Sequence, residues 1–330
     1  MKDTKLDAPL RVYWDINYIG SFPGSLLEKN DILKVADEVI ACRPFYVNLG
    51  EDILNFSHLK DLLEKFKTAQ IMLSLSSSSL VNEVEDLDFL KEHKVDFLEF
   101  KLDPHIDEIK KDTGYLDKIK TTLDAYAGIT KKVCPSLIVT GENYVLLPVI
   151  IDFLAQNGVK YFKMPNTVIN ERTVNNISQK HMIYEDVAKL GELITDKVDY
   201  YKSKMEFFIH DLFIFEIFFP VKGESKQRAE YDGCQAGNAL CYIDHKGDLY
   251  LCSSLYMSLG SLLENSIRKL FKSEKRLEFK KMIDEQHHEK CVQCADFSEC
   301  KGGCRGIVYF LNDSFLGLDP LCPYSGKGGE

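Results

Sequence analysis

The chain has 330 residues, of which 45% are hydrophobic and 28% charged. This length and composition predict a globular protein with one large domain and one smaller domain. The formal net charge of −10 gives a negative surface that repels phosphate backbones, so we do not expect nucleic acid as a partner. The apolar segments fall short of the roughly 18 residues of a membrane span, and the N-terminus lacks the apolar region of a signal peptide. We therefore expect a cytoplasmic protein that does not contact a membrane.

Short β-rich runs alternate with amphipathic helical patterns over the first 205 or so residues. Strands are expected at 11–16, 45–49, 70–76, 96–102, 136–140 and 160–164. Helical patterns lie at 32–40, 57–66 (with Ser57 as the expected N-cap), 87–93, 115–126, 145–156 and 185–198. This alternation predicts βαβ units and a parallel sheet, either doubly wound or an open, incomplete barrel. The serine run at 74–79 is expected to form the turn after the third strand.

The pattern changes near residue 222, where a polar, glycine-containing segment begins. We place a domain boundary there and expect domains at 1–222 and 223–330. The segment CYIDHKGDLYLC at 241–252 reads as a β-hairpin that turns at His245–Lys246–Gly247. A helix is expected within 261–285, followed by a loop-rich end. Such a module has little apolar core, so cross-links would have to stabilise it.

The cysteines are concentrated in this second part of the chain. Eight of the ten cysteines lie there, namely Cys234, Cys241, Cys252, Cys291, Cys294, Cys300, Cys304 and Cys322. Clustered cysteines in a cytoplasmic protein indicate metal or redox chemistry rather than disulfides. Structural zinc and iron–sulfur clusters both use pairs of the form C-x2-C. Because one zinc ion takes only four ligands, eight thiols favour two sites.

The cysteine arrangement resembles that of two-cluster ferredoxins, in which one cysteine of a close group reaches across to the other cluster. By this analogy Cys291, Cys294 and Cys300 bind cluster one, and Cys322, which precedes Pro323, completes it. Cys304 would cross over to cluster two, together with Cys234 and Cys252. Cys241 has two readings: the fourth ligand of cluster two, on a strand nearly opposite Cys252, or a small buried apolar residue.

The spacing C-x2-C-x5-C-x3-C, with Cys234, Gly247, Cys252 and Cys322 in register, resembles the seven-cysteine SPASM pattern of the radical SAM/SPASM superfamily. The words CQAG (234–237), IDHKGDLYLC (243–252) and LGSLLENSI (259–267) support this resemblance. It implies an α/β fold in which a partial (β/α)6 TIM-like barrel precedes a small, loop-rich domain with a β-hairpin. It also implies one or two auxiliary [4Fe–4S] clusters in that domain.

The first half of the chain departs from the pattern of this superfamily. Its C-x3-C-x2-C motif, which binds the cluster that cleaves S-adenosylmethionine, is replaced by Gly20, Gly24 and Leu27. No cysteine precedes Cys42, so we expect no S-adenosylmethionine cluster. The family's GGEP loop, which binds the amino group of S-adenosylmethionine, corresponds to LGED at 49–52, with Asp52 in place of proline. We interpret this loop as a relic, with small-molecule binding as the alternative.

Within the superfamily the chain most resembles the SPASM-domain proteins of the GeoRSP peptide-maturation system, through the missing motif and the segment 207–220. This resemblance implies an accessory protein rather than a self-sufficient enzyme. Its partners would be a radical SAM/SPASM enzyme and a PqqD-like peptide chaperone or precursor peptide, and its role electron transfer, peptide binding, or both. Two alternatives stay open: a structural module held together by iron–sulfur or zinc, and an enzyme with an unrecognised site at the barrel mouth.

Three polar residues near the cysteines have more ordinary readings. His287 and His288 precede Cys291 and are interpreted as solvated residues or as caps of a helix C-terminus. Arg305 follows Cys304, where its charge would tune a cluster or, equally, form a surface salt bridge.

Overall fold

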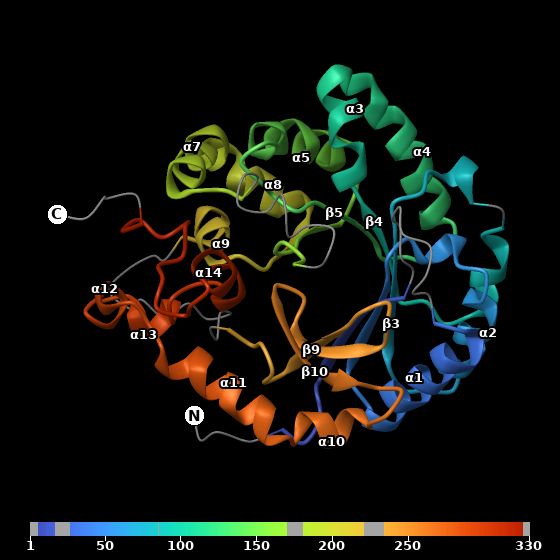
Figure 1. Cartoon of the computed structure of the whole chain (residues 1–330). Coiled ribbons are helices and arrows are strands. Elements are labelled where there is room, and N and C mark those ends of the chain that lie inside the picture. Colours follow the sequence, from blue (N-terminus) through green and yellow to red (C-terminus); the bar gives the residue numbers. More distant parts are fainter. Residues whose placement is uncertain (1–5, 17–26, 85, 170–180, 221–233, 326–330) are drawn as a thin grey trace. The chain divides into compact units, whose positions relative to one another are not determined.

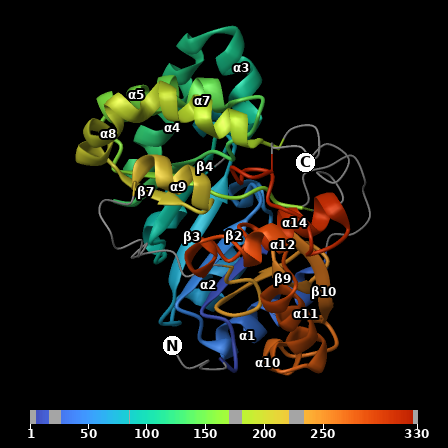
Figure 2. The same ribbon diagram turned by 90° about the vertical axis from the view of Figure 1, so that its left-hand side faces the viewer.

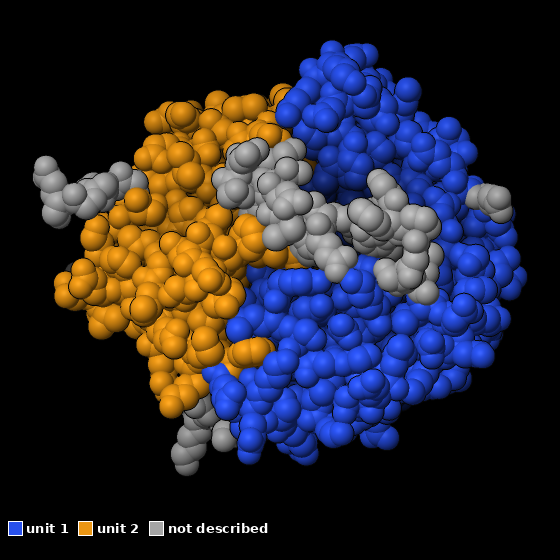
Figure 3. Space-filling model, viewed as in Figure 1, with its two compact units in different colours: residues 1–136, 236–278 blue, residues 137–235, 279–330 orange. Residues whose placement is uncertain are grey.

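A computed structural model describes residues 6–16, 27–84, 86–169, 181–220 and 234–325. The chain divides into two compact units (Figure 3). Unit 1 comprises 1–136 and 236–278, and unit 2 comprises 137–235 and 279–330. The domain boundary predicted between residues 222 and 223 falls in 221–233, outside the described residues, and stays a prediction.

Unit 1 contains five parallel strands that pair in the order in which the chain makes them (Figure 1). They are β1 (Arg11–Asp15), β2 (Tyr46–Gly50), β3 (Met72–Ser77), β4 (Phe97–Lys101) and β5 (Val133–Ser136). The predicted parallel α/β sheet is therefore confirmed, and the first four strands lie where they were expected. The expected strand at 136–140 was placed too late, because β5 ends at Ser136. The serine run is also partly strand rather than turn, since β3 continues to Ser77.

The helices that connect the parallel strands of unit 1 are α1 (Lys29–Cys42), α2 (Leu59–Phe66), α3 (Ile106–Lys111) and α4 (Leu116–Ala127), with 3-10 turns η1 (Ile53–Asn55), η2 (Val81–Glu83), η3 (Asp88–Glu92), η4 (Asp103–His105) and η5 (Thr113–Tyr115). The helices α1, α2 and α4 follow the predicted apolar stripes, whereas α3 was not predicted. In α1 the buried positions Ile32, Val35 and Val39 repeat at helical spacing. The N-cap of α2 is His58 rather than the predicted Ser57, and the pattern at 87–93 forms only the 3-10 turn η3.

The two faces of the unit 1 sheet differ in chemistry. In the parallel register Val12 pairs with Val47 and Trp14 with Leu49, and this apolar face continues through Leu75. The alternate residues share the opposite face, which is polar: Tyr13, Asp15, Asn48, Ser74, Ser76, Glu99, Lys101, Ser136 and Tyr242. This polar face is nevertheless buried, since Asn48 exposes 6% of its surface and Glu99 4%. Buried polar groups require partners, and the side-chain amide of Asn48 donates to the hydroxyls of Ser74 and Ser76.

The predicted hairpin is confirmed and joins the same sheet. Strand β8 (Leu240–Ile243) pairs in parallel with β1, and β9 (Asp248–Cys252) returns antiparallel to β8. A further strand that was not predicted, β10 (Leu255–Ser261), pairs antiparallel with β9. The single helix expected within 261–285 is two helices, α10 (Ile267–Phe271) and α11 (Glu274–Glu285).

Unit 2 contains two parallel strands and a group of helices (Figure 2). The strands are β6 (Tyr161–Met164), as predicted, and β7 (Glu206–Ile209), which was missed. The helices are α5 (Leu147–Gln156), α7 (Tyr184–Ile194), α8 (Val198–Lys204), α9 (Leu212–Phe218), α12 (Glu289–Val292), α13 (Phe297–Cys300) and α14 (Arg305–Asn312), with 3-10 turns η6 (Tyr144–Leu146) and η7 (Thr195–Lys197). No helix in the described ranges is both long and apolar enough to cross a membrane.

The hairpin turn is held by one buried side chain, Asp244. Its Oδ1 accepts hydrogen bonds from the backbone N–H groups of Lys246 and Asp248, each at 2.9 Å. Its Oδ2 accepts from the hydroxyl of Tyr250 at 3.2 Å. This side chain therefore fixes the turn that sets the pairing of β8 with β9.

We expect Asp244→Ala to lower the free energy of unfolding by about 1–3 kcal/mol, because two backbone N–H groups and the hydroxyl of Tyr250 lose their acceptor. Asp244→Asn keeps the Oδ1 acceptor and should lose less. Urea-induced unfolding measures both effects, with the surface variant Asp107→Ala as the control. An Asp244→Ala variant that unfolds at the wild-type urea concentration would contradict this role.

Candidate functional site

Five of the cysteines lie in one segment of unit 2, built from short helices and turns. Cys291 lies in α12, Cys300 ends α13 and Cys304 is the N-cap of α14. Between Cys300 and Cys304 three successive residues have left-handed backbones: Lys301 (φ 52°), Gly302 (φ 81°) and Gly303 (φ 72°). A Cβ at Gly303 would collide with the carboxylate of Asp319, so glycine is required there. This turn redirects the chain between the cysteines assigned to different clusters.

The thiols expected to bind cluster one are electrostatic neighbours. Burial raises the pKa of the Cys300 thiol to about 12, and the charge of Cys322 adds to this rise. Burial also raises the pKa of Cys322 to about 11, with further contributions from Cys291 and Cys294. Four thiols in one neighbourhood are the donor set that a [4Fe–4S] cluster takes. Within the described residues, no three Cys, His, Asp or Glu side chains lie close enough together to hold a single metal ion.

The cysteines expected to bind cluster two belong to different parts of the chain. Cys234 and Cys304 lie in unit 2, and the charges of both act on the guanidinium of Arg305. Cys252 ends β9 in unit 1, where its Sγ accepts a hydrogen bond from the backbone N–H of Ser254 at 3.4 Å. The backbone N–H of Cys304 donates to Asp319 Oδ2 at 2.7 Å, which ties the Cys304 turn to the segment before Cys322.

The register of the hairpin bears on whether Cys241 is a cluster ligand or a small buried apolar residue. Tyr242 pairs with Tyr250, and continuing this register places Cys252 beside Leu240 rather than Cys241. The expectation of a compatible face was wrong, since the side chains of Cys241 and Cys252 point to opposite faces of the sheet. Cys241 pairs with Val12 on the apolar face and is fully buried. These observations favour the reading of Cys241 as a small buried apolar residue.

The polar residues around the cysteines have defined structural roles. His287 Nε2 bonds to the carbonyl of Asp284 at 2.9 Å and so caps the C-terminus of α11, as one of the two readings predicts. His288 instead caps the N-terminus of α12, where its Nδ1 accepts from the backbone N–H of Lys290. Arg305 forms no surface salt bridge, because it is completely buried.

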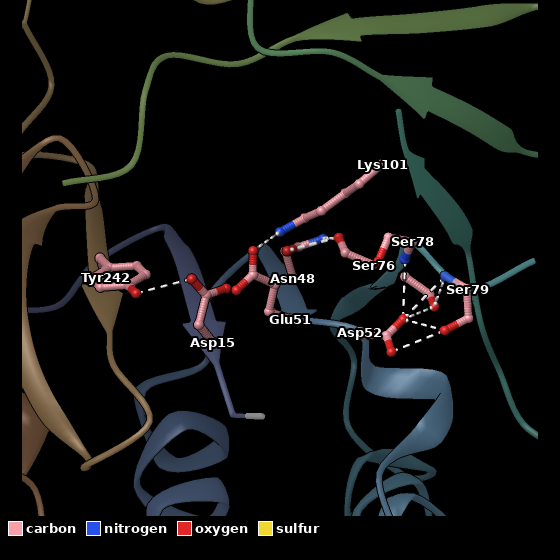
Figure 4. Close-up of polar contacts among 10 residues, drawn as sticks. Asp15, Asn48, Glu51, Asp52, Ser76, Ser78, Ser79, Lys101 and Tyr242 are labelled. Carbon is pink, nitrogen blue, oxygen red and sulfur yellow. Dashed lines mark hydrogen bonds and ion pairs between the residues drawn. The ribbon is translucent and has the colours of Figure 1, made fainter. Parts of the chain in front are cut away.

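A second group of polar side chains lies on the polar face of the unit 1 sheet, at the carboxyl ends of the strands (Figure 4). Lys101 Nζ, at the end of β4, lies 3.4 Å from the carboxylate of Glu51, which follows β2. Asp15, at the end of β1, accepts a hydrogen bond from the hydroxyl of Tyr242 at 2.9 Å. Burial disfavours the Lys101 charge, but Glu51, Asp15 and other carboxylates outweigh it, so the pKa of Lys101 is raised.

Asp52 organises the serine run beside this group (Figure 4). Its carboxylate accepts from the hydroxyl of Ser77 at 2.5 Å, the backbone N–H of Ser78 at 3.1 Å and the hydroxyl of Ser79 at 2.8 Å. Burial opposes its charge, but the hydrogen bonds from Ser77, Ser79 and Asn55 outweigh burial and lower the pKa of Asp52. Asp52, which stands in place of the family's proline, therefore has a structural role of its own.

Sequence reasoning did not single out Asp15, Asn48, Glu99 or Lys101. The available signal was a charged or amide residue inside an otherwise apolar strand, as in RVYWD and FLEFK. Of the positions that replace the missing motif, Gly20 and Gly24 lie outside the described residues, and Leu27 lies just before α1.

We expect Asp52→Asn to be less stable than wild type at pH 7 by about 1–3 kcal/mol, the range for buried charge-assisted hydrogen bonds. A lowered pKa stabilises the fold above the pKa of the unfolded state, and this contribution is lost as the pH falls through the folded-state value. The difference between variant and wild type should therefore shrink below about pH 4. Thermal unfolding between pH 3 and 7 tests this, and a difference that stays constant with pH would contradict it.

A family model for SPASM, an iron–sulfur cluster-binding domain, matches residues 234–295. This range contains Cys234, Cys252, Cys291 and Cys294. The mycofactocin maturase MftC of Mycobacterium tuberculosis is 21% identical over 96% of this chain and 83% of its own length. The sequence likeness thus extends beyond the SPASM region into the parallel-sheet part of the chain.

Solved structures share the fold. Streptococcus suis SuiB, bound to the precursor peptide SuiA, matches 98% of this chain and 77% of its own with a TM-score of 0.73 and 15% identity. The structure of anSMEcpe with bound AdoMet matches 95% of this chain and 94% of its own, with a TM-score of 0.66 and 18% identity. The predicted fold class is thereby confirmed, a half-barrel of parallel strands followed by the antiparallel strands of the SPASM region. Residues 234–295 thus match the SPASM family model, and the chain as a whole is similar to a maturase and to solved structures of the same fold.

Proposed function

We propose that this protein is an accessory of peptide maturation that binds one or two auxiliary [4Fe–4S] clusters and acts with a separate radical SAM/SPASM enzyme. The proposal rests on one contrast within the sequence. The cysteines of the SPASM pattern are all present, whereas no cysteine precedes Cys42 and no C-x3-C-x2-C motif occurs anywhere in the sequence. A chain of this kind keeps the auxiliary clusters but cannot assemble the S-adenosylmethionine cluster through that motif.

The cluster ligands that we propose follow from the sequence and from the neighbourhood of the thiols. Cys291, Cys294, Cys300 and Cys322 would hold cluster one, and their mutual electrostatic influence supports this set. Cys234, Cys252 and Cys304 are proposed for cluster two on the cysteine spacing alone. Cluster potentials depend on burial and on hydrogen bonds to sulfur, such as the bond from Ser254 to Cys252. Redox centres tuned in this way suit a protein that exchanges electrons with a partner enzyme.

The relatives support a link to peptides. SuiB is known in complex with a precursor peptide, and MftC is named a maturase. We therefore propose a precursor peptide, or a PqqD-like chaperone that presents one, as a further partner. This is the arrangement of the GeoRSP system, which the sequence most resembles.

Anaerobically prepared protein is expected to be brown and to contain about four irons per chain for one cluster or about eight for two. Cys291→Ser and Cys322→Ser should each remove the iron of cluster one and destabilise the cysteine segment, because metal binding is coupled to folding. Iron and sulfide quantification with EPR measures this. Cys42→Ser, which lies outside both ligand sets, is the matched control.

Three results would count against the proposal in different ways. A colourless protein with stoichiometric zinc would exclude the clusters, and full iron content in Cys291→Ser or Cys322→Ser would exclude the ligand assignment. Failure to co-purify with a radical SAM/SPASM enzyme of the same organism would exclude the partner.

One observation favours a second candidate function, small-molecule binding at the barrel mouth. The hydroxyl of Ser136 has no hydrogen-bond partner among the described residues, although the residue is only 1% exposed. Ser136 is the register partner of Lys101 and shares the polar face with it. A buried hydroxyl without a partner marks a place where another polar molecule fits. The carboxylates around Lys101 would favour a ligand that carries a positive charge.

If the barrel mouth keeps this function, S-adenosylmethionine should bind the wild-type protein in a calorimetric titration. Glu51→Gln should then weaken binding by about tenfold or more, the loss of one charge-assisted hydrogen bond. Ser298→Ala, at an exposed position, should leave binding unchanged. No measurable heat with the wild-type protein would remove this ligand from consideration.

A further inference from the structure

Arg305 is among the largest fully buried side chains of the protein, with none of its surface exposed. It begins α14, directly after Cys304. Its guanidinium donates to the carbonyl of Gly302 at 3.2 Å, to that of Gln286 at 2.7 Å and to that of Phe315. The guanidinium carbon also lies 5.6 Å from the centroid of the Phe315 ring. Three carbonyls and one aromatic ring therefore fix the position of the charge.

The contacts of Arg305 leave one donor unused. Its Nε is buried and has no hydrogen-bond partner among the described residues. Buried N–H donors are almost always paired, and those of a charged group most of all. The Nε–H of Arg305 is therefore available to an acceptor that the protein chain does not itself supply.

The charge of Arg305 is also incompletely balanced. No carboxylate forms an ion pair with it among the described residues, and the ionisable groups that act on it are Cys234, Cys291, Asp319 and Cys304. Asp319 already accepts hydrogen bonds from the backbone N–H groups of Cys304 and Leu321. A buried cation is unfavourable without a counter-charge. Neutral thiols do not supply one, whereas thiolates bound to iron do.

We infer that Arg305 is the buried counter-cation of the cluster sites, and that its Nε–H donates a hydrogen bond to a sulfur of a bound cluster or of a ligating cysteine. This inference rests on the proposed cluster binding. The cysteines near Arg305 come from both proposed ligand sets: Cys291 belongs to cluster one, and Cys234 and Cys304 belong to cluster two. One-electron reduction adds a negative charge to a cluster, so a fixed cation beside it stabilises the reduced form and raises the reduction potential. Arg305 is thus a positioning and tuning residue, not a ligand.

A second buried arginine provides a matched control. Arg276 is 6% exposed, donates to the carbonyl of Gly237, stacks on the ring of Phe271 and likewise has an unpaired Nε. The charge that acts on it is that of Asp7, and no cysteine contributes. Loss of Arg276 therefore removes a buried guanidinium of the same kind without removing a charge beside the thiols.

The test is an EPR-monitored titration of the reconstituted full-length protein with dithionite under anaerobic conditions. Arg305→Gln should shift the ratio of reduced to oxidised cluster about tenfold toward the oxidised form, equal to about 59 mV for one electron. Arg276→Gln should leave the potential unchanged. Arg305→Lys keeps the charge and should shift the potential less than Arg305→Gln. The Arg305→Lys variant should also lose an exchangeable-proton coupling that ENDOR detects at the reduced cluster of the wild-type protein.

The outcomes separate this inference from the function on which it rests. Wild-type protein without iron would overturn the proposed function and this inference together. Iron-loaded Arg305→Gln with a wild-type potential would overturn the inference alone. Should Arg305→Gln fail to fold, the ENDOR comparison of wild type with Arg305→Lys decides. An unchanged exchangeable-proton coupling in Arg305→Lys would overturn the Nε hydrogen bond.

Discussion

Side chains alternate between the two faces of a strand, and this constraint governs unit 1. The apolar alternation of Val12 and Trp14, carried across the sheet through Val47 and Leu49, forms one apolar face. The same period forces the remaining residues onto the other face, where burial leaves polar groups without water. Other side chains of the same face act as partners for these buried polar groups. Asn48 donates to the hydroxyls of Ser74 and Ser76, and Lys101 balances Glu51. Among the described residues of the polar face, the Ser136 hydroxyl is the one buried side-chain group without a hydrogen-bond partner.

The cysteine segment of unit 2 is held by a different combination of interactions. Apolar side chains are buried in it, among them Val308, Phe315 and Leu321, and Cys304, Phe310 and Leu311 pack against Ile169 and Ile307. Hydrogen bonds from Arg305 and to Asp319 also hold its turns. Iron–sulfur clusters, if bound as proposed, would add to its stability. The left-handed run at 301–303 has glycine at two of its three positions, where this backbone conformation costs little.

The sequence predicted local features well where one residue pattern determines them. The stripes of α1 and α2 and four strands of unit 1 follow from periodicity, and the hairpin follows from its alternation about Gly247. Strand β7 was missed because EFFI runs into the apolar segment that forms α9, and only His210 and Asp211, the N-cap of α9, separate them. The polar face was missed for another reason. Asp15, Asn48 and Lys101 are far apart in sequence, and only the strand order brings them together.

Hydrogen bonds in a turn can determine which of two thiols is available to a metal. Cys241 and Cys252 lie on strands joined by the turn that Asp244 holds, and they face opposite sides of the sheet. Shifting β9 against β8 by a single residue would move Cys252 to the other face of the sheet, while Cys241 would stay beside Val12. In the proposed function, where Cys252 is a cluster ligand, the position of its thiol thus depends on a carboxylate that is not itself a ligand. An insertion or deletion at 244–247 would then move the Cys252 thiol while leaving every cysteine of the sequence in place.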